Sequence, residues 1–502
     1  MNGQPIAYHH EFLGTKMQFL PFLFRISHHN ISLLRGCLLL GLIGGMNSQA
    51  IADGRNHVKD AEIIRASLVS QFQELFDGMS SSAKQGYYHL VTNVYLPHDF
   101  DEEVLQRLDN EEMPSPFPDV LETDHRREAT FLRFGLSGRP DEPLKPLQYV
   151  STPDSRYAMN CFACHGGNTY GATYPGAPNT LYALESLTEN VRRVKLKMGK
   201  PLAHMELGSL FMPLGTSVGT SNAVMFGVAL MNFRDRDLNV HSNRAPAAMN
   251  HHDMDAPPWW HFHRKHHIYM DGFAEKGHRG LMQFMLVRQN GPDRFRSWEQ
   301  DFKDVYAFLE ELRPPKYPLP VDGEIAARGE RIFSKHCSSC HGSYGNQSTY
   351  PEILVGIDDI KTDRTRLESL TPEHRKHYGE SWFAHYGKQD TIEEVDGYIA
   401  PPLDGIWASA PYFHNGSVPT LWHLLHPEER PIVWRRTHLS FDTSKVGLQI
   451  ESLDKVPNRL KPEARRRYFD TQLRGKSSSG HDYPNALSET EREELLEYLK
   501  TL

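Results

Sequence analysis

Two copies of the pattern C-x-x-C-H, at residues 161–165 and 337–341, constrain this chain more than any other feature of its sequence. The chain has five cysteines, and the two copies use four of them. C-x-x-C-H is the attachment signature of c-type haem. Two thiols add to the vinyl groups of the porphyrin, and the adjacent histidine reaches the iron. The sequence therefore predicts two covalently bound c-type haems, held by Cys161, Cys164, His165, Cys337, Cys340 and His341.

Two other chemistries use paired cysteines and explain the pattern less well. A thioredoxin-like C-x-x-C does not need the histidine that follows it. Zinc sites place two C-x-x-C pairs about 12–20 residues apart, whereas these two pairs lie in different parts of the chain. The attachment of c-type haem takes place outside the cytoplasm, so the haem interpretation also predicts an exported protein.

The first 50 residues predict a secretory signal segment. Lys16, Arg25 and Arg35 precede the short apolar run CLLLGLIGG, and small residues end the segment at Ala50. A basic region, an apolar region and a small-residue cleavage site are typical of exported proteins, and we expect a periplasmic or otherwise exported location. The apolar run is too short to span a bilayer, so no stable membrane span is expected. A buried helix of the folded protein is the alternative interpretation.

The amino-acid composition and a proline-rich segment predict two folded domains after the signal segment. Hydrophobic residues make up 39% of the 502 residues, which is enough for real cores. The net charge of −8 argues against a nucleic-acid partner. Prolines in ELRPPKYPLPVDG, at 311–323, predict an extended linker between an N-terminal haem domain, 51–315, and a C-terminal haem domain, 316–502. We expect a mainly α fold: two cytochrome c-like haem domains with extended loops and minor β structure.

Two segments carry clear helix signals. Residues 180–198 have apolar residues at spacings of three and four. In the last segment, 488–502, Ser488 and Glu491 have the spacing of a capping box. The expected buried stripe of that last helix consists of Leu495, Leu496, Leu499 and Leu502.

Residues 401–425, PPLDGIWASAPYFHNGSVPTLWHLL, resemble the C-terminal signature of the bacterial di-haem cytochrome c peroxidases and the related MauG enzymes. A narrower similarity to the di-haem rubber oxygenases rests on DAPPWW, at 255–260, and on the final segment SGHDYPNALSETEREELLEYLKTL. The resemblance covers both predicted haem domains. It implies a haem-dependent oxidoreductase in which His165 and His341 are the proximal iron ligands.

The resemblance also implies a second ligand on the second iron. In the peroxidases this ligand is a methionine, and Glu428 stands at its position here. In the rubber oxygenases it is a histidine near the C-terminus, which His481 matches. His423 and His426 are the alternatives. Two histidine ligands imply a low-potential electron-transfer haem, because a methionine ligand raises the potential.

For the first iron, the resemblance implies an open or water-bound side. The peroxidases cover this iron with a histidine, and the matching loop, 210–223, contains none. Trp259 and Trp260 match the rubber-oxygenase position beside this haem, where an indole would line the pocket or relay an electron; a core aromatic pair is the alternative. Gln283 matches a glutamine of the peroxidases and is the third candidate catalytic residue. The distal glutamate of the peroxidases is missing, and Asp293 is the nearest candidate acid.

A calcium site between the domains is a further implication of the resemblance. Ser409 and Pro411 match positions that supply backbone oxygens, and Asn222 would supply a side-chain oxygen. Calcium takes oxygen ligands of this kind. A tight turn that binds no metal is the alternative.

Arginine and histidine residues also suggest contacts with charged groups. Arg234, Arg264 and Arg279 are candidate partners for haem propionates. The histidine-rich run HFHRKHH, at 261–267, is typical of a solvated, weakly basic face more often than of a metal site.

We therefore expect an exported di-haem oxidoreductase that activates peroxide or dioxygen at the N-terminal haem. The C-terminal haem would relay electrons, with a small electron-transfer protein as redox partner. The alternative is a non-catalytic di-haem electron-transfer cytochrome, in which His204, His241 or His251 would cover the first iron.

Overall fold

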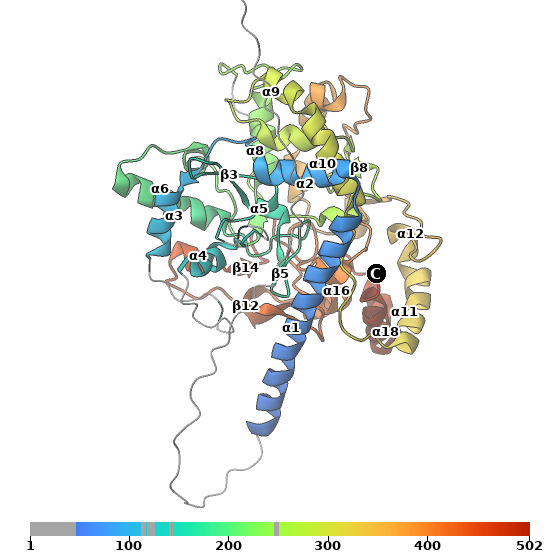
Figure 1. Ribbon diagram of the computed structural model, residues 1–502. Coiled ribbons are helices and arrows are strands. Elements are labelled where there is room, and N and C mark those ends of the chain that lie inside the picture. The colour runs from blue at the N-terminus through green and yellow to red at the C-terminus, as the bar shows by residue number, and fades with distance from the viewer. Residues whose placement is uncertain (1–46, 112–116, 118–125, 140–141, 143, 245–249) are drawn as a thin grey trace, which may run out of the picture.

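The computed structural model describes residues 47–111, 117, 126–139, 142, 144–244 and 250–502, with the side chains of the first helix described from Ile63 on. The predicted secretory segment, 1–50, lies outside the described residues except for its last four, which begin helix α1 (Figure 1). No helix in the described part of the chain is both long and apolar enough to cross a membrane.

Helices dominate the secondary structure, at 42% against 13% for strands. The helices before residue 312 are α1 Asn47–Gly78, α2 Ser81–Thr92, α3 Glu102–Asp109, α4 Arg126–Phe134, α5 Phe162–His165, α6 Leu184–Met198, α7 His204–Gly208, α8 Ala223–Asn232, α9 Pro292–Ser297 and α10 Glu299–Glu311. Those after residue 322 are α11 Gly323–His336, α12 Ser338–His341, α13 Ile357–Ile360, α14 Thr365–Ser369, α15 Pro372–Gly379, α16 Leu421–Leu425, α17 Pro462–Arg465 and α18 Glu489–Leu499. Short 3-10 helices are η1 Trp259–His261, η2 Gly280–Met285, η3 Trp382–Ala384, η4 Ile406–Ala408, η5 Pro427–Glu429 and η6 Tyr483–Ala486.

The strands form small antiparallel sheets. One three-stranded sheet has the order β1-β3-β2, from β1 Phe100–Asp101, β2 Tyr149–Ser151 and β3 Arg156–Met159. Another has the order β13-β12-β14, from β12 Val433–Asp442, β13 Gly447–Leu453 and β14 Tyr468–Asp470. The two-stranded pairs are β4 Asn168–Thr169 with β5 Ala172–Thr173, β6 Thr220–Ser221 with β7 Met254–Asp255, β8 His267–Ile268 with β9 Ala274–Glu275, and β10 Leu354–Gly356 with β11 Gly397–Ile399.

Each C-x-x-C-H motif lies beside a closely packed helix pair, α2 with α10 for the first and α11 with α18 for the second (Figure 1). A Cβ at Gly86 of α2 would lie 2.1 Å from the carbonyl oxygen of Asp304 in α10. A Cβ at Gly329 of α11 would lie 2.0 Å from the carbonyl oxygen of Glu494 in α18. Each pair therefore crosses where a glycine lets the two backbones touch.

The helix and linker signals of the sequence match the structure. α10 ends at Glu311 and α11 begins at Gly323, so the intervening segment is the predicted extended linker. The predicted helix over 180–198 is α6, and its first turn begins at Leu184. α18 follows Ser488, whose side chain accepts from Glu491 in the predicted capping box.

The larger hydrophobic core draws residues from both sides of the 311–323 segment, from Ile64 in α1 to Leu499 in α18. Two fully buried tryptophans, Trp260 and Trp407, belong to it. A smaller cluster packs under α3, α4 and α6. Because one core is shared, the segments that carry the two haem motifs are held in fixed positions relative to each other.

Candidate haem-binding sites

Both C-x-x-C-H motifs fold into a single helical turn. The amide of His165 donates to the carbonyl of Cys161 at 3.2 Å, and the amide of His341 donates to that of Cys337 at 3.0 Å. This i to i+4 bond puts the first cysteine and the histidine of each motif on the same face. None of the four motif cysteines forms a disulfide.

Three of the motif cysteines, Cys161, Cys164 and Cys337, have raised thiol pKa values because they are buried. Burial raises the pKa of the Cys161 thiol to about 12 and that of the Cys164 thiol to about 11. Burial likewise raises the pKa of Cys337 to about 11. A thioredoxin-like pair has a lowered thiol pKa, so these values favour the haem interpretation over that rival.

The two motif histidines are oriented in the same way. The Nδ1–H of His165 donates to the carbonyl of Pro257 at 3.1 Å, and the Nδ1–H of His341 donates to the carbonyl of Pro401 at 2.8 Å. Each acceptor is the first proline of an A-P-P sequence, at 256–258 and 400–402. Since the carbonyl fixes Nδ1 as the protonated nitrogen, Nε2 keeps its lone pair for a metal.

This pair of acceptors is the part of the site that the sequence analysis missed. The signal was present as the repeated A-P-P, once after each haem motif. It is weak because proline-rich triplets are common in loops, and because the acceptor is a backbone carbonyl, which any residue supplies.

His481 lies opposite His341. The centres of the two rings are 6.2 Å apart, with an angle of 62° between their planes. Imidazole nitrogens bind first-row metals such as zinc at about 2.0–2.1 Å, so two imidazoles on opposite sides of one metal ion have centres roughly 6 Å apart. Burial lowers the pKa of His481 to about 3, which keeps the ring in the neutral form that a metal requires.

The alternative ligands for the second iron are engaged elsewhere. The Nδ1 of His423 is 2.7 Å from the hydroxyl of Thr420. His426 uses both ring nitrogens, one with the carbonyl of Trp422 and the other with Glu489. Glu428, at the position of the peroxidase methionine, forms an ion pair with Arg492. The geometry therefore favours His481.

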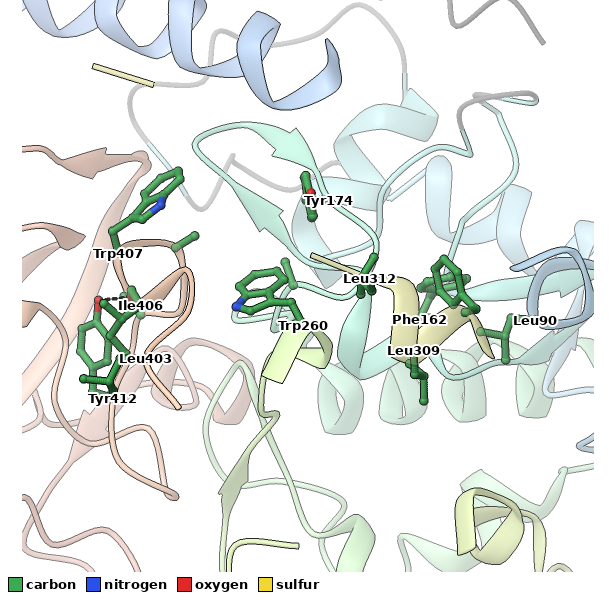
Figure 2. Close-up of a cluster of buried hydrophobic side chains, with 14 of the residues drawn as sticks. Leu90, Phe162, Tyr174, Trp260, Leu309, Leu312, Leu403, Ile406, Trp407 and Tyr412 are labelled. Carbon is green, nitrogen blue, oxygen red and sulfur yellow. Dashed lines mark hydrogen bonds between the residues drawn. The ribbon is translucent and has the colours of Figure 1, made fainter. Parts of the chain in front are cut away.

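Trp259 and Trp260 follow the first A-P-P and have different environments. The Trp259 ring stacks on His165, with centres 4.7 Å apart. Trp260 is fully buried, and its Nε1–H donates to the carbonyl of Asp404 at 2.8 Å. Figure 2 shows Trp260 between the cluster around Trp407 and Tyr412 and the cluster around Leu312 and Phe162. Trp260 thus joins the segments that follow the two A-P-P sequences.

The histidines that would cover the first iron in an electron carrier each lie near a carboxylate. His204 is 3.6 Å from Asp99, and His241 is 2.9 Å from Asp235. The Nε2 of His251 lies 3.1 Å from Asp253 Oδ1, and its Nδ1 is hydrogen-bonded to the side-chain amide of Asn222. Among the described residues, none of these rings faces His165 as His481 faces His341.

The two candidate residues suggested by the peroxidases, Asp293 and Gln283, differ in solvent exposure. The side chain of Asp293 is fully exposed and lies 3.8 Å from Arg296. This exposure argues against Asp293, the nearest candidate in the sequence, as a distal acid. Gln283 is half-buried in η2. Its role as a catalytic residue stays a prediction.

No hydrogen bond among the described residues links the three candidate calcium ligands, Asn222, Ser409 and Pro411. The Asn222 side chain contacts His251 and the carbonyl of Pro213, and its Oδ1 is buried without a partner. The hydroxyl of Ser409 donates to the carbonyl of Gly405, and Pro411 follows Ala410 through a cis peptide bond. Calcium at these positions stays a prediction.

The residues present fit c-type haem. Each motif supplies two unpaired cysteines and a neutral histidine whose Nδ1–H is already bonded, so the remaining donors match thioether attachment and axial ligation. The second motif also has an opposing imidazole at the spacing of a bis-histidine metal site.

Comparison with known families supports this chemistry for one segment. Residues 397–435 match the family model described as RoxA-like, cytochrome c-like. The RoxA-like segment contains Pro401 and Asp404, the carbonyls that accept from His341 and Trp260. It therefore includes the backbone that orients the second motif, and it indicates a covalently bound c-type haem and a haem oxidoreductase.

Two curated relatives come from Sinorhizobium fredii. The uncharacterized protein y4iM is 33% identical over 239 residues, which cover 39% of this chain and 53% of the relative. The uncharacterized protein y4iJ is 27% identical over 257 residues, which cover 38% of this chain and 41% of the relative. The chain therefore spans about half the length of the curated relatives it matches, or less.

Proposed function

We propose that this chain is an exported di-haem c-type oxidoreductase of the peroxidase, MauG and rubber-oxygenase group. Peroxide or dioxygen would react at the iron held by His165, and the iron held by His341 and His481 would supply or store electrons. A small electron-transfer protein would exchange electrons with the second haem.

One asymmetry carries the proposal. His341 has an opposing imidazole, His481, whereas the ring in contact with His165 in the described part of the chain is the indole of Trp259. An iron with two strong protein ligands transfers electrons, and an iron with one open side binds small oxidants. When bound, the two haems would thus supply one-electron storage at one site and oxidant activation at the other.

The protein residues have defined parts in this scheme. Pro257 and Pro401 hold the Nδ1 protons, so both histidines keep one tautomer throughout turnover. Trp259 stacks on His165 and would hold the orientation of that ring. Trp260 is buried, and its indole donates to the carbonyl of Asp404, which gives a bonded route between the segments that carry Pro257 and Pro401.

Cyanide titration of the oxidised protein tests the proposal. Cyanide binds ferric iron that has an open or weakly held position, so we expect one equivalent per chain. No binding would favour the non-catalytic electron-transfer cytochrome. Tight binding of two equivalents would contradict ligation of the second iron by His481.

A further inference from the structure

Arg366 in α14 has a buried guanidinium without hydrogen bonds. The residue is 1% exposed, and none of its three side-chain nitrogens has a hydrogen-bond partner among the described residues. Its ion-pair partner is Asp271, whose Oδ2 lies 3.5 Å from Arg366 Nη1. Buried polar groups almost always have hydrogen-bond partners, so this guanidinium is expected to receive one from outside the chain.

Asp271 does not neutralise Arg366 by itself, because it is shared. Its Oδ2 accepts a hydrogen bond from Arg375 Nη2 at 3.0 Å, and both residues are buried. Two guanidinium groups therefore face one carboxylate. A surplus positive charge away from water is costly unless an anion pairs with it.

The arginines that the sequence suggested as propionate partners are already engaged. Arg234 donates to four backbone carbonyls, those of Leu238, Leu286, Val287 and Asn290. Arg264 lies 2.7 Å from Asp404, and Arg279 bonds to Glu299. These contacts already engage all three, whereas in the described part of the chain Arg366 is buried with no hydrogen bond on any of its side-chain nitrogens.

α14 is tied to the segments that hold the second haem. The carbonyl of Asp363 accepts from the hydroxyl of Tyr398 in β11, which lies three residues before Pro401. The Oδ2 of Asp363 accepts from the amide of Ser477, four residues before His481, and its Oδ1 accepts from the amide of Thr365, the first residue of α14. The start of α14 is therefore bonded to the segments that carry Pro401 and His481, and Arg366 lies in the first turn of that helix.

We propose that Arg366 binds a propionate carboxylate of a bound haem. A guanidinium presents parallel N–H donors that match the two oxygens of a carboxylate. The propionates are the anionic groups that a haem brings into a buried site, and one of them supplies the negative charge that Asp271 cannot. The inference rests on haem attachment and not on catalysis.

A redox titration of the purified holoprotein tests the assignment. Removing a buried cation beside a haem stabilises the ferric form. In Arg366→Gln we expect the ratio of reduced to oxidised haem, for one of the two haems, to fall about tenfold at fixed ambient potential, or about 59 mV for a one-electron couple. The matched control is Arg133→Gln, since Arg133 is a buried arginine whose partners Glu111 and Glu463 belong neither to a haem motif nor to α14. It should leave both ratios unchanged.

Arg366→Lys supplies a second test that does not depend on the folding of the glutamine variant. Lysine keeps the charge and loses the paired donors, so the ratio should stay within about threefold of wild type. The propionate bending bands in the resonance Raman spectrum should shift, because they respond to hydrogen bonding of the carboxylate. Unchanged bands in Arg366→Lys would overturn the proposal.

Two outcomes separate this proposal from others. Unchanged potentials in Arg366→Gln, together with a wild-type melting temperature that rises with added inorganic phosphate, would assign Arg366 to an exchangeable anion and overturn the propionate assignment. A protein that carries no covalent haem after export would refute the proposed function itself. These failures are distinguishable, because the first occurs in a protein that contains both haems.

Discussion

The indole of Trp260 donates a hydrogen bond to the carbonyl of Asp404 at 2.8 Å. Each of these residues stands three positions after the proline that binds a motif histidine, Pro257 for Trp260 and Pro401 for Asp404. The contact therefore joins equivalent points of the two haem-binding segments. It gives a short bonded connection from His165 to His341 through the protein.

Replacing Trp260 with phenylalanine should slow electron exchange between the haems. The ring would stay apolar, but the bond to Asp404 would be lost, at a cost of about 1 kcal/mol of stability. We expect the exchange rate to fall by roughly tenfold, which corresponds to about 1.4 kcal/mol in the barrier. Flash photolysis of the partly reduced, carbon monoxide-bound protein measures this rate.

Trp407→Phe is the matched control for that experiment. Trp407 is also fully buried, and its Nε1–H donates to the carbonyl of Pro315 at 3.0 Å. Its loss should lower stability by a similar amount and leave the exchange rate unchanged. Equal slowing in both variants would show that Trp260 acts through packing alone.

His481→Ala should convert the second haem from low spin to high spin. The variant removes the imidazole opposite His341, and added imidazole should restore the low-spin spectrum by filling the space. The optical spectrum of the oxidised protein reports this change. His423→Ala removes a buried histidine of the same region and should leave the spectrum as in wild type. The reverse result would make His423 the ligand.

The number of haems bound per chain tests each of the two C-x-x-C-H motifs separately. Intact-mass measurement of the exported protein should find two covalent haems, and substitution of Cys337 and Cys340 by serine should remove one of them. The remaining haem should keep a high-spin spectrum, because His165 would be its protein ligand. A single haem in wild type would contradict the di-haem account.

Acid should weaken the contact between the segments that carry Pro257 and His481. Lys476 lies 2.9 Å from Asp253, and both side chains are buried. Burial alone would raise the pKa of Asp253, but the hydrogen bond from His251 and the charge of Lys476 hold it well below its usual value. A carboxyl whose pKa is depressed in the folded state stabilises the fold above its unfolded pKa of about 3.9, and this stability is lost as pH falls below that value.

Asp253→Asn should therefore lower stability by about 3 kcal/mol at neutral pH, because it leaves Lys476 buried without its partner. The difference from wild type should shrink as pH falls below about 4. Urea unfolding at several pH values measures this difference. A gap that is constant from pH 7 to pH 3 would mean that Asp253 acts through packing and not through its charge.

The sequence predicted local structure better than the environment of the candidate sites, and the attachment of two covalent haems stays a prediction. Cysteine spacing defined the two motifs, proline placed the linker, and the resemblance singled out His481, which the structure sets opposite His341. The bonds to Pro257 and Pro401 were not predictable, because backbone acceptors carry no residue signature. The same limit applies to Arg234, whose partners are four carbonyls, and to the exposed position of Asp293.

The electron paramagnetic resonance spectrum of the oxidised protein, recorded before and after addition of peroxide, tests the central claim most directly. The account predicts one low-spin signal from the haem held by His341 and His481. It also predicts one high-spin signal, from the haem held by His165, that changes when peroxide is added. Two low-spin signals that do not respond to peroxide would contradict the account and identify the chain as an electron carrier.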